Sequence, residues 1–118
     1  MTVLTRGMII DVNLDPIQGA EKGKTRPCVV ITNDIYNQRV PVIQVIPLTA
    51  WSEKKSKIKT NVLIQPTVEN GLSKPSLADC LQTRPIDHRY RLIKVRGILS
   101  NDDLKNIEQA LKIVFALS

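Results

Sequence analysis

Gly19-Ala20-Glu21-Lys22-Gly23-Lys24-Thr25-Arg26-Pro27 is a glycine-rich, charged segment that separates two apolar runs, 8–14 and 28–34. The two runs have the composition of β-strands, so we expect the charged segment to be the loop between them. It places one carboxylate and one guanidinium, Glu21 and Arg26, five residues apart. Binding and catalytic residues often lie on such loops because rigid strands position them, although a solvent-exposed turn has the same composition.

Short runs rich in Val and Ile continue along the chain, separated by turn residues, and this pattern is typical of an all-β barrel or sandwich. The expected strands are 8–14, 27–32, 42–48, 60–65, 76–82 and 93–97, with a short turn or bend at 35–39, a polar loop at 49–59 and a turn at Glu69-Asn70-Gly71.

The C-terminal part changes from strand to helix periodicity. Ser100-Asn101-Asp102-Asp103 has the composition of an N-cap followed by acids in the first turn, which favour the helix dipole. Apolar residues then recur at spacings of three and four, at Leu104, Ile107, Leu111 and Val114, and Ala110, Ile113 and Leu117 widen the apolar face. We predict one amphipathic helix that covers one side or end of the barrel.

Length and composition are those of one globular domain, residues 1–118, with one core. Aromatic residues make up only 3% of the chain, so the core must consist of Val, Ile and Leu. No apolar run approaches the roughly 20 residues of a membrane helix, and no signal-peptide pattern is visible, so we expect a cytoplasmic protein. Cys28 and Cys80 lie in apolar runs and are predicted to be buried free thiols, and with one histidine we expect neither metal nor cofactor.

The chain carries a net charge of +6, with a pI of about 9.6. The basic residues are partly clustered, and clustering favours contacts with the phosphates of a nucleic acid over simple solubility. The clusters are Lys22/Lys24/Arg26, Lys54/Lys55/Lys57/Lys59 and Arg84/Arg89/Arg91/Lys94/Arg96.

Four segments resemble the MazF/PemK (Kid) family of toxins, in family order and at family spacing over nearly the full length. They are Arg6-Gly7; Leu14-Asp15-Pro16-Ile17-Gln18-Gly19-Ala20-Glu21 running into Thr25-Arg26-Pro27-Cys28-Val29-Val30-Ile31-Thr32-Asn33-Asp34; Pro47-Leu48-Thr49; and Gln82-Thr83-Arg84-Pro85-Ile86-Asp87 before the C-terminal helix. The resemblance implies an SH3-like β-barrel with a C-terminal α-helix, acting as a homodimer. It also implies metal-independent cleavage of single-stranded RNA, usually mRNA, at a short sequence, and a MazE-like antitoxin that blocks the RNA groove.

The resemblance assigns the central catalytic role to Arg26 and a phosphate-binding hydroxyl to Thr49. RNA is cleaved without metal when its 2′-hydroxyl loses a proton to a base and attacks phosphorus, while fixed donors stabilise the developing charge. Glu21 is our candidate base, and Arg26 would hold the scissile phosphate and donate to the leaving oxygen.

The predicted RNA contacts combine family positions with loop residues. Gln82 and Arg84 match family positions near the RNA groove, where an amide reads a base edge and a guanidinium binds phosphate. The other candidates are Lys22, Lys24, Asn33, Trp51, Lys54, Lys55 and Lys57. Trp51 either stacks on a base or seals the barrel end, and we expect His88 to be a surface residue.

The sequence departs from the family at two positions. Met8 replaces a frequent Asp, and Leu81 replaces an acid that is the proposed base in some relatives. We therefore favour Glu21 as the catalytic base. Asp79 is an alternative, because strand alternation would put it on the same face as Leu81. An inactive RNA-binding barrel and a non-enzymatic toxin that binds a protein such as DNA gyrase stay open as alternatives.

Overall fold

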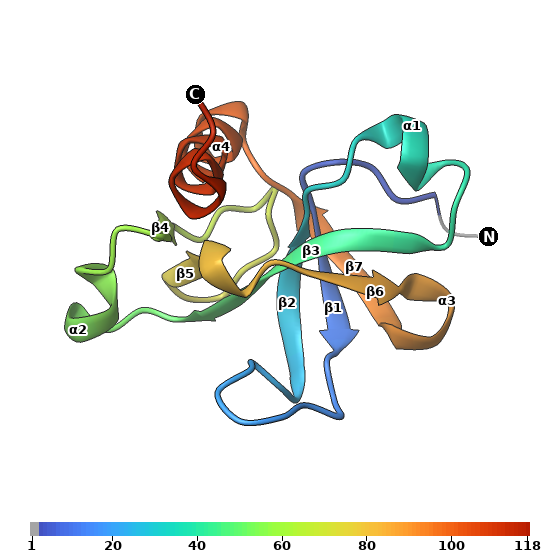
Figure 1. The fold of residues 1–118 in the computed structure, drawn as a ribbon, viewed down its shortest axis with the longest axis horizontal. Coiled ribbons are helices and arrows are strands. Elements are labelled where there is room, and N and C mark those ends of the chain that lie inside the picture. The colour runs from blue at the N-terminus through green and yellow to red at the C-terminus, as the bar shows by residue number, and fades with distance from the viewer. Residues whose placement is uncertain (1–2) are drawn as a thin grey trace.

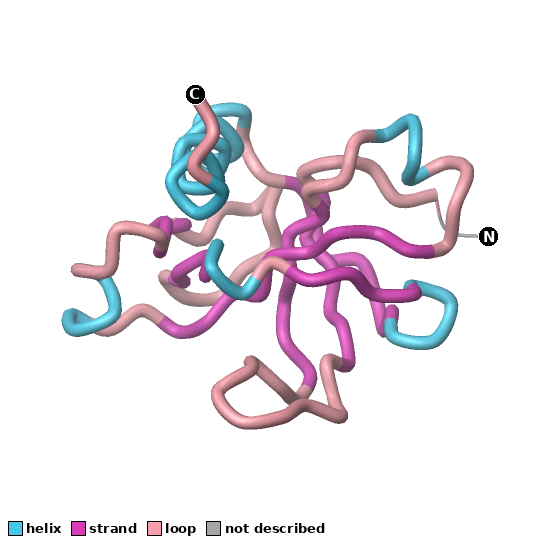
Figure 2. The backbone as a smooth tube through the Cα atoms, in the orientation of Figure 1, coloured by secondary structure: helices cyan, strands magenta, loops and turns pink. Residues whose placement is uncertain are grey.

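The computed structural model describes residues 3–118, which form a bent antiparallel sheet with one long helix packed on it (Figures 1 and 2). In chain order the elements are β1 (Met8–Asn13), β2 (Thr25–Val30), α1 (Asp34–Asn37), β3 (Val42–Ala50), α2 (Glu53–Ser56), β4 (Asn61–Ile64), β5 (Ser76–Asp79), the 3₁₀ helix η1 (Cys80–Gln82), β6 (Arg84–Asp87), α3 (His88–Arg91), β7 (Leu92–Ile98) and α4 (Asn101–Phe115). The prediction of a mainly-β fold closed by one C-terminal helix is confirmed.

The central strand is β3, which pairs with three different strands along its length. Its first part pairs with β6 and with β2, ending at the pair Cys28↔Pro47, and its last part, from Leu48 to Ala50, pairs with β5. The strand order is β4-β5-β3-β2-β1-β7, with β6 beside β3. Because β3 passes from one group of strands to the other at Pro47, the end of β2 that carries Arg26 lies beside this transition.

The apolar side chains form two clusters, where we expected one core. Successive strand residues point to opposite faces, so Ile9 and Val29 enter one cluster while Ile10, Val12 and Cys28 enter the other. The first cluster lies beneath α4, and the second lies among β1, β2, β3 and β6. Both thiols are free and buried, as predicted.

The C-terminal helix α4 begins as the sequence predicts. The Ser100 hydroxyl accepts a hydrogen bond from Asp103 N at 3.1 Å, and Ile107 and Ala110 are buried in the first cluster. The prediction that Ile113 and Leu117 widen the buried face of the helix is wrong. Their side chains are 59% and 62% exposed, because α4 packs through one side only. Within residues 3–118, no helix has the length and apolar character needed to cross a membrane.

Three predicted elements differ from the structure. The strand expected at 76–82 ends at Asp79, the chain turns through η1, and a separate strand, β6, follows. The same-face pairing of Asp79 with Leu81 is therefore wrong, and so is a single strand carrying both Gln82 and Arg84. The 35–39 turn contains the short helix α1, and the 49–59 loop contains α2, whose N-cap Ser52 accepts from Lys55 N.

The segment 65–72 is a tightly held turn. Asn70 is 1% exposed. Its side-chain Oδ1 accepts from Thr67 N and Leu72 N, both at 3.0 Å, and its side-chain Nδ2 donates to Gln65 O at 2.9 Å. Gly71 has φ +69 and lies so close to the backbone of Arg96 that a Cβ would collide with it.

Candidate functional site

The β1–β2 loop, residues 14–24, lies at the end of the sheet where β2 begins with Thr25 and Arg26 (Figure 1). Leu14 N donates to Lys24 O at 2.9 Å, and Lys24 N donates to the Asp15 carboxylate at 2.9 Å. The predicted glycine-rich loop is therefore present, and its two ends are bonded to one another.

Two arginines from distant elements hold the start of this loop. Arg84 of β6 donates to Leu14 O at 3.1 Å. Arg91 of α3 donates to Asn13 O at 3.0 Å and to Asp15 O at 2.7 Å. Three consecutive carbonyl groups of the chain are therefore bound by guanidinium groups that lie 70 to 78 positions away in sequence.

The Arg26 side chain is half-buried and donates from Nε to Gly23 O at 2.9 Å, so its guanidinium is turned toward the loop. Burial raises the pKa of the Cys28 thiol to about 12, and the positive charges of Arg84 and Arg26 act in the opposite direction. Arg26 donates to Gly23 O and Arg84 donates to Leu14 O, so both guanidiniums bond to the same loop. The two arginines therefore lie at the base of the β1–β2 loop, where Leu14 N bonds to Lys24 O.

Thr49 lies on β3 beyond the point where β3 leaves β2. Arg26 precedes Cys28 by two residues and Thr49 follows Pro47 by two, so the register Cys28↔Pro47 puts both side chains on the same face of the two strands. Thr49 is 7% exposed and is paired with Leu77 of β5. The hydroxyl thus belongs to a rigid part of the sheet.

Glu21 is exposed at the tip of the loop. Its carboxylate accepts from Gln18 N at 2.7 Å, and it makes no ion pair with Lys24 within residues 3–118. Glu21 borders a cavity of about 410 Å³, which Arg26 and Thr49 do not line. The residues that line it are Glu21, Leu81, Gln82, Thr83, Arg84 and Pro85.

Gln82 and Asp79 contact the loop on both sides of Glu21. The Gln82 amide accepts from Lys22 N at 3.2 Å and donates to Ala20 O at 3.3 Å. The Lys22 ammonium lies 3.7 Å from the Asp79 carboxylate, and both side chains are mostly buried. The structure therefore brings Glu21, Lys22, Gln82 and Arg84 together.

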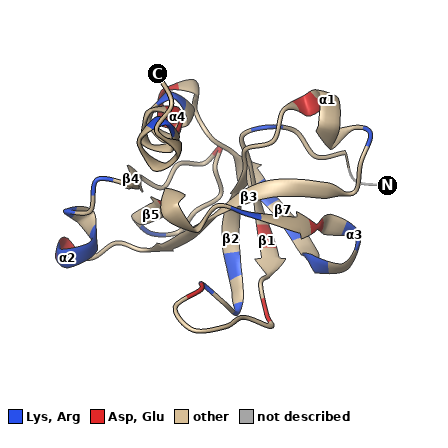
Figure 3. Cartoon of the chain, in the orientation of Figure 1, with Lys and Arg blue, Asp and Glu red and all other residues tan. Residues whose placement is uncertain are grey.

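The remaining predicted RNA contacts lie away from this cluster. Figure 3 shows the basic residues of α2 separated from those of β2 and the loop. Lys54, Lys55 and Lys57 are exposed there, and Trp51, before α2, is 46% exposed, which disfavours the interpretation that it seals the barrel. Asn33 lies beyond the opposite end of β2 from Arg26 and caps α1 by accepting from Ile35 N, so it does not join the cluster.

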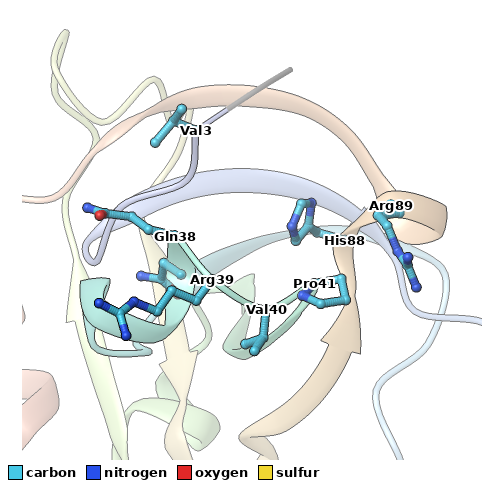
Figure 4. A pocket seen from close by; sticks show the side chains of 8 residues that line it. Val3, Gln38, Arg39, Val40, Pro41, His88 and Arg89 are labelled. Atoms are coloured by element: carbon cyan, nitrogen blue, oxygen red, sulfur yellow. The ribbon is translucent and has the colours of Figure 1, made fainter.

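A larger cavity, of about 550 Å³, lies elsewhere (Figure 4). It is lined by Val3, Asn37, Gln38, Arg39, Val40, Pro41, His88 and Arg89. No predicted catalytic or RNA-binding residue is among them. His88, which we expected to be a surface residue, is partly exposed and lines this cavity. Cavity size therefore does not identify the candidate site.

Sequence reasoning missed two features of the site. Arg91 was noted only as part of a basic cluster, and Asp79 only as a substitute base, whereas the structure shows both bound to the β1–β2 loop. No local pattern reveals such contacts because the partners lie far apart in sequence. Among the described residues, no group of three or more His, Cys, Asp or Glu side chains is arranged to hold a metal ion.

Comparison with known proteins places this geometry in a family. Residues 5–115 match the family described as PemK-like, MazF-like toxin of type II toxin-antitoxin system. The endoribonuclease MazF of Staphylococcus saprophyticus is 33% identical over 115 residues, which span 98% of this chain and 93% of the relative.

Solved structures show the same fold. The crystal structure of MazF from Deinococcus radiodurans superimposes with a TM-score of 0.84 at 22% identity, covering 98% of this chain and 99% of that one. MazE-MazF from the same organism gives 0.76 at 18% identity, covering 100% of both chains. The chain therefore belongs to the PemK-like, MazF-like toxin family of type II toxin–antitoxin systems, and its mainly-β fold with a C-terminal helix is the MazF-type fold.

Proposed function

We propose that the chain is an endoribonuclease toxin that cleaves single-stranded RNA, mRNA in particular, without a metal ion. The observation that carries the proposal is that the guanidiniums of Arg26 and Arg84 bond to Gly23 O and Leu14 O, at the two hydrogen-bonded ends of the loop that carries Glu21. Two positive charges held at the base of one loop are suited to a phosphodiester whose negative charge increases in the transition state. The name of the staphylococcal relative, endoribonuclease MazF, supports the same reaction.

In the proposed mechanism the 2′-hydroxyl of the RNA is the nucleophile. Glu21 accepts its proton, the oxygen attacks phosphorus, and the bond to the 5′-oxygen breaks. The 5′-oxygen takes a proton from solvent water, so the products carry a 2′,3′-cyclic phosphate and a 5′-hydroxyl. Arg26 binds the phosphate through its guanidinium N–H groups and donates to the leaving oxygen, acting as a charged donor since it stays protonated. Thr49 donates its hydroxyl to a non-bridging phosphate oxygen.

The RNA strand would extend from this centre over the basic surface. Arg84, Lys22 and Lys24 bind phosphates near the scissile bond, and Gln82 reads a base edge through its amide. Lys54, Lys55 and Lys57 continue the positive surface, and the exposed Trp51 stacks on a base. Asn33 stays a predicted contact that would need a strand long enough to reach the other end of β2.

Two assembly features belong to the proposal. The chain acts as a homodimer, and its location is the cytoplasm, where mRNA is available. A MazE-like antitoxin inhibits it by occupying the RNA groove. The solved MazE-MazF complex from Deinococcus radiodurans supports an antitoxin partner. An acidic antitoxin segment would complement the net charge of +6.

The proposal is tested by incubating the purified protein with a long RNA in EDTA and mapping the product ends. We expect cuts at one short sequence, with 2′,3′-cyclic phosphate and 5′-hydroxyl ends. RNA that is bound but intact would indicate an inactive RNA-binding barrel. Intact, unbound RNA together with inhibited DNA supercoiling would favour a gyrase-directed toxin, and either result would contradict the proposal.

A further inference from the structure

The tip of the β1–β2 loop is held by three contacts from one short segment, 79–82. Gln82 bonds to Ala20 O and Lys22 N, and Asp79 pairs with the Lys22 ammonium. Glu21 lies between the two residues that are held. In the free protein the segment 79–82 therefore holds the residues on both sides of the candidate base.

These contacts use the same groups that the proposed function assigns to RNA. The Lys22 ammonium cannot fully neutralise a phosphate while it is paired with Asp79, and the Gln82 amide has only one N–H and one oxygen lone pair left for a base while it is bonded to the loop. In this state the loop uses part of the bonding capacity of Lys22 and Gln82, and RNA gains all of it only by displacing these contacts.

The tip contacts are also the longer ones. Their lengths are 3.2, 3.3 and 3.7 Å, whereas Arg84 and Arg91 hold the start of the loop with bonds of 2.7 to 3.1 Å. Longer hydrogen bonds and a partly solvated ion pair are weaker. The tip should therefore be released while the start of the loop stays attached to β6 and α3.

We propose that Asp79 is a positioning residue that, together with Gln82, holds the β1–β2 loop closed in the free protein. We call the three contacts of Asp79 and Gln82 with the loop the latch, and RNA binding breaks them. The inference rests on the proposed function, because it concerns access of RNA to the same site. It assigns to Asp79 a role other than general base. The carboxylate restrains Lys22 in the free protein and releases it to the incoming phosphate.

The experiment compares Asp79→Asn with Glu69→Gln, an equal charge change at an exposed residue of the 65–72 turn. Binding is measured by anisotropy with an RNA that carries a 2′-deoxy nucleotide at the cut site, and cleavage with the matching all-RNA substrate. A mostly buried but solvent-reachable ion pair opposes binding by up to about fivefold. We therefore expect Asp79→Asn to lower the dissociation constant and KM two- to fivefold while kcat stays within twofold and Glu69→Gln changes neither.

A second measurement does not depend on catalysis. Amide exchange across residues 16–24 should be faster in Asp79→Asn and in Gln82→Ala than in the wild type, with exchange in β1 and β2 unchanged. Lys22→Met breaks the same pair from the loop side. In that background, Asp79→Asn should have no further effect on RNA affinity, because the two changes remove one interaction.

Two results would overturn the latch. One is a fall in kcat of about a hundredfold in Asp79→Asn with loss of the acidic limb of the pH–rate profile, which would make Asp79 the base. The other is identical affinity, kinetics and loop exchange in Asp79→Asn and Glu69→Gln. Failure of the proposed function is separate, since the wild type itself would then leave the all-RNA substrate intact.

Discussion

Two irregular segments of this molecule, the β1–β2 loop and the 65–72 turn, are both held by side chains that bond to the backbone, but they are held in different ways. In the turn, the buried Asn70 bonds only to neighbours within five positions, and Gly71 packs against the backbone of Arg96. In the loop, local side-chain bonds are joined by bonds from side chains 60 to 78 positions away, and the held residues are largely exposed. We infer that the turn is part of the fold, whereas the loop is held by exchangeable contacts that a ligand can replace.

The largest difference in stability is expected between alanine substitutions of two glycines with positive φ, one in each segment. Gly71→Ala should cost about 3–5 kcal/mol, because left-handed strain adds to a collision with the Arg96 carbonyl. Gly19→Ala has the same strain, φ +56, but nothing within 4 Å of the new Cβ, so about 1 kcal/mol is expected. Urea unfolding of both variants measures the difference, and equal losses would show that packing does not distinguish the two segments.

Amide side chains give the next contrast. Asn70→Ala leaves the buried Leu72 N and the partly buried Thr67 N without an acceptor and should destabilise the protein by about 2–4 kcal/mol. Gln82→Ala removes two bonds that water can replace, so stability should change by less than about 0.5 kcal/mol. A comparable loss of stability in both variants, measured by thermal or urea unfolding, would mean that the loop contacts belong to the fold.

Trp51 tests how far the RNA surface extends beyond the loop. It is the only tryptophan and is 46% exposed, so its fluorescence should change when RNA binds. Loss of stacking in Trp51→Ala should weaken RNA binding by about 1–3 kcal/mol, with little change in unfolding. An unaffected affinity combined with lowered stability would show that the indole seals the sheet instead.

The two thiols should show that the core stays closed when the loop moves. Burial raises the pKa of Cys28 and of Cys80 from 9.0 to about 12, so both are neutral in the folded state at pH 8. We expect no reaction of either thiol with a disulfide reagent at pH 8 in native wild type or in Gln82→Ala. Rapid labelling of Cys28 in Gln82→Ala alone would show that loop release opens the second cluster.

The same thiols predict a pH dependence of stability. Because the folded pKa lies above the unfolded one, their contribution is fully present below pH 9 and is lost as the pH rises toward 12. The free energy of unfolding should therefore fall between pH 9 and 11, and the fall should be smaller in a variant with both cysteines changed to Ala. An equal fall in both proteins would assign the alkaline loss to other groups.

Periodicity predicted the parts of the fold that depend on local sequence. The strands β1, β2 and β3, the Ser100 cap and the buried face of α4 follow from alternation and from spacings of three and four. The strand expected at 76–82 failed because its composition does not reveal the 3₁₀ turn at Cys80–Gln82, which is stabilised by the Thr83 hydroxyl bonded to Cys80 O. Tertiary contacts decided that boundary.

The site was only partly predictable for the same reason. The loop between two strands and its charged residues were visible in the sequence, and in the structure both Arg26 and Arg84 bond to this loop. The attachment of the loop by Arg91, Gln82 and Asp79 was not visible, because each bond joins residues that no local pattern relates. The division of the apolar residues into two clusters likewise depends on how β3 bends between its partners.

The most direct test of the central claim is the single-turnover cleavage rate of Arg26→Ala compared with Arg39→Ala. Arg39 is an exposed arginine at the unrelated cavity, so the pair controls for loss of one positive charge. Removing a donor that stabilises the transition state should slow cleavage by about 10²-fold or more. Our account predicts that loss in Arg26→Ala, with Arg39→Ala within twofold of the wild type, both proteins being folded. Undiminished cleavage by Arg26→Ala, or equal losses in the two variants, would contradict it.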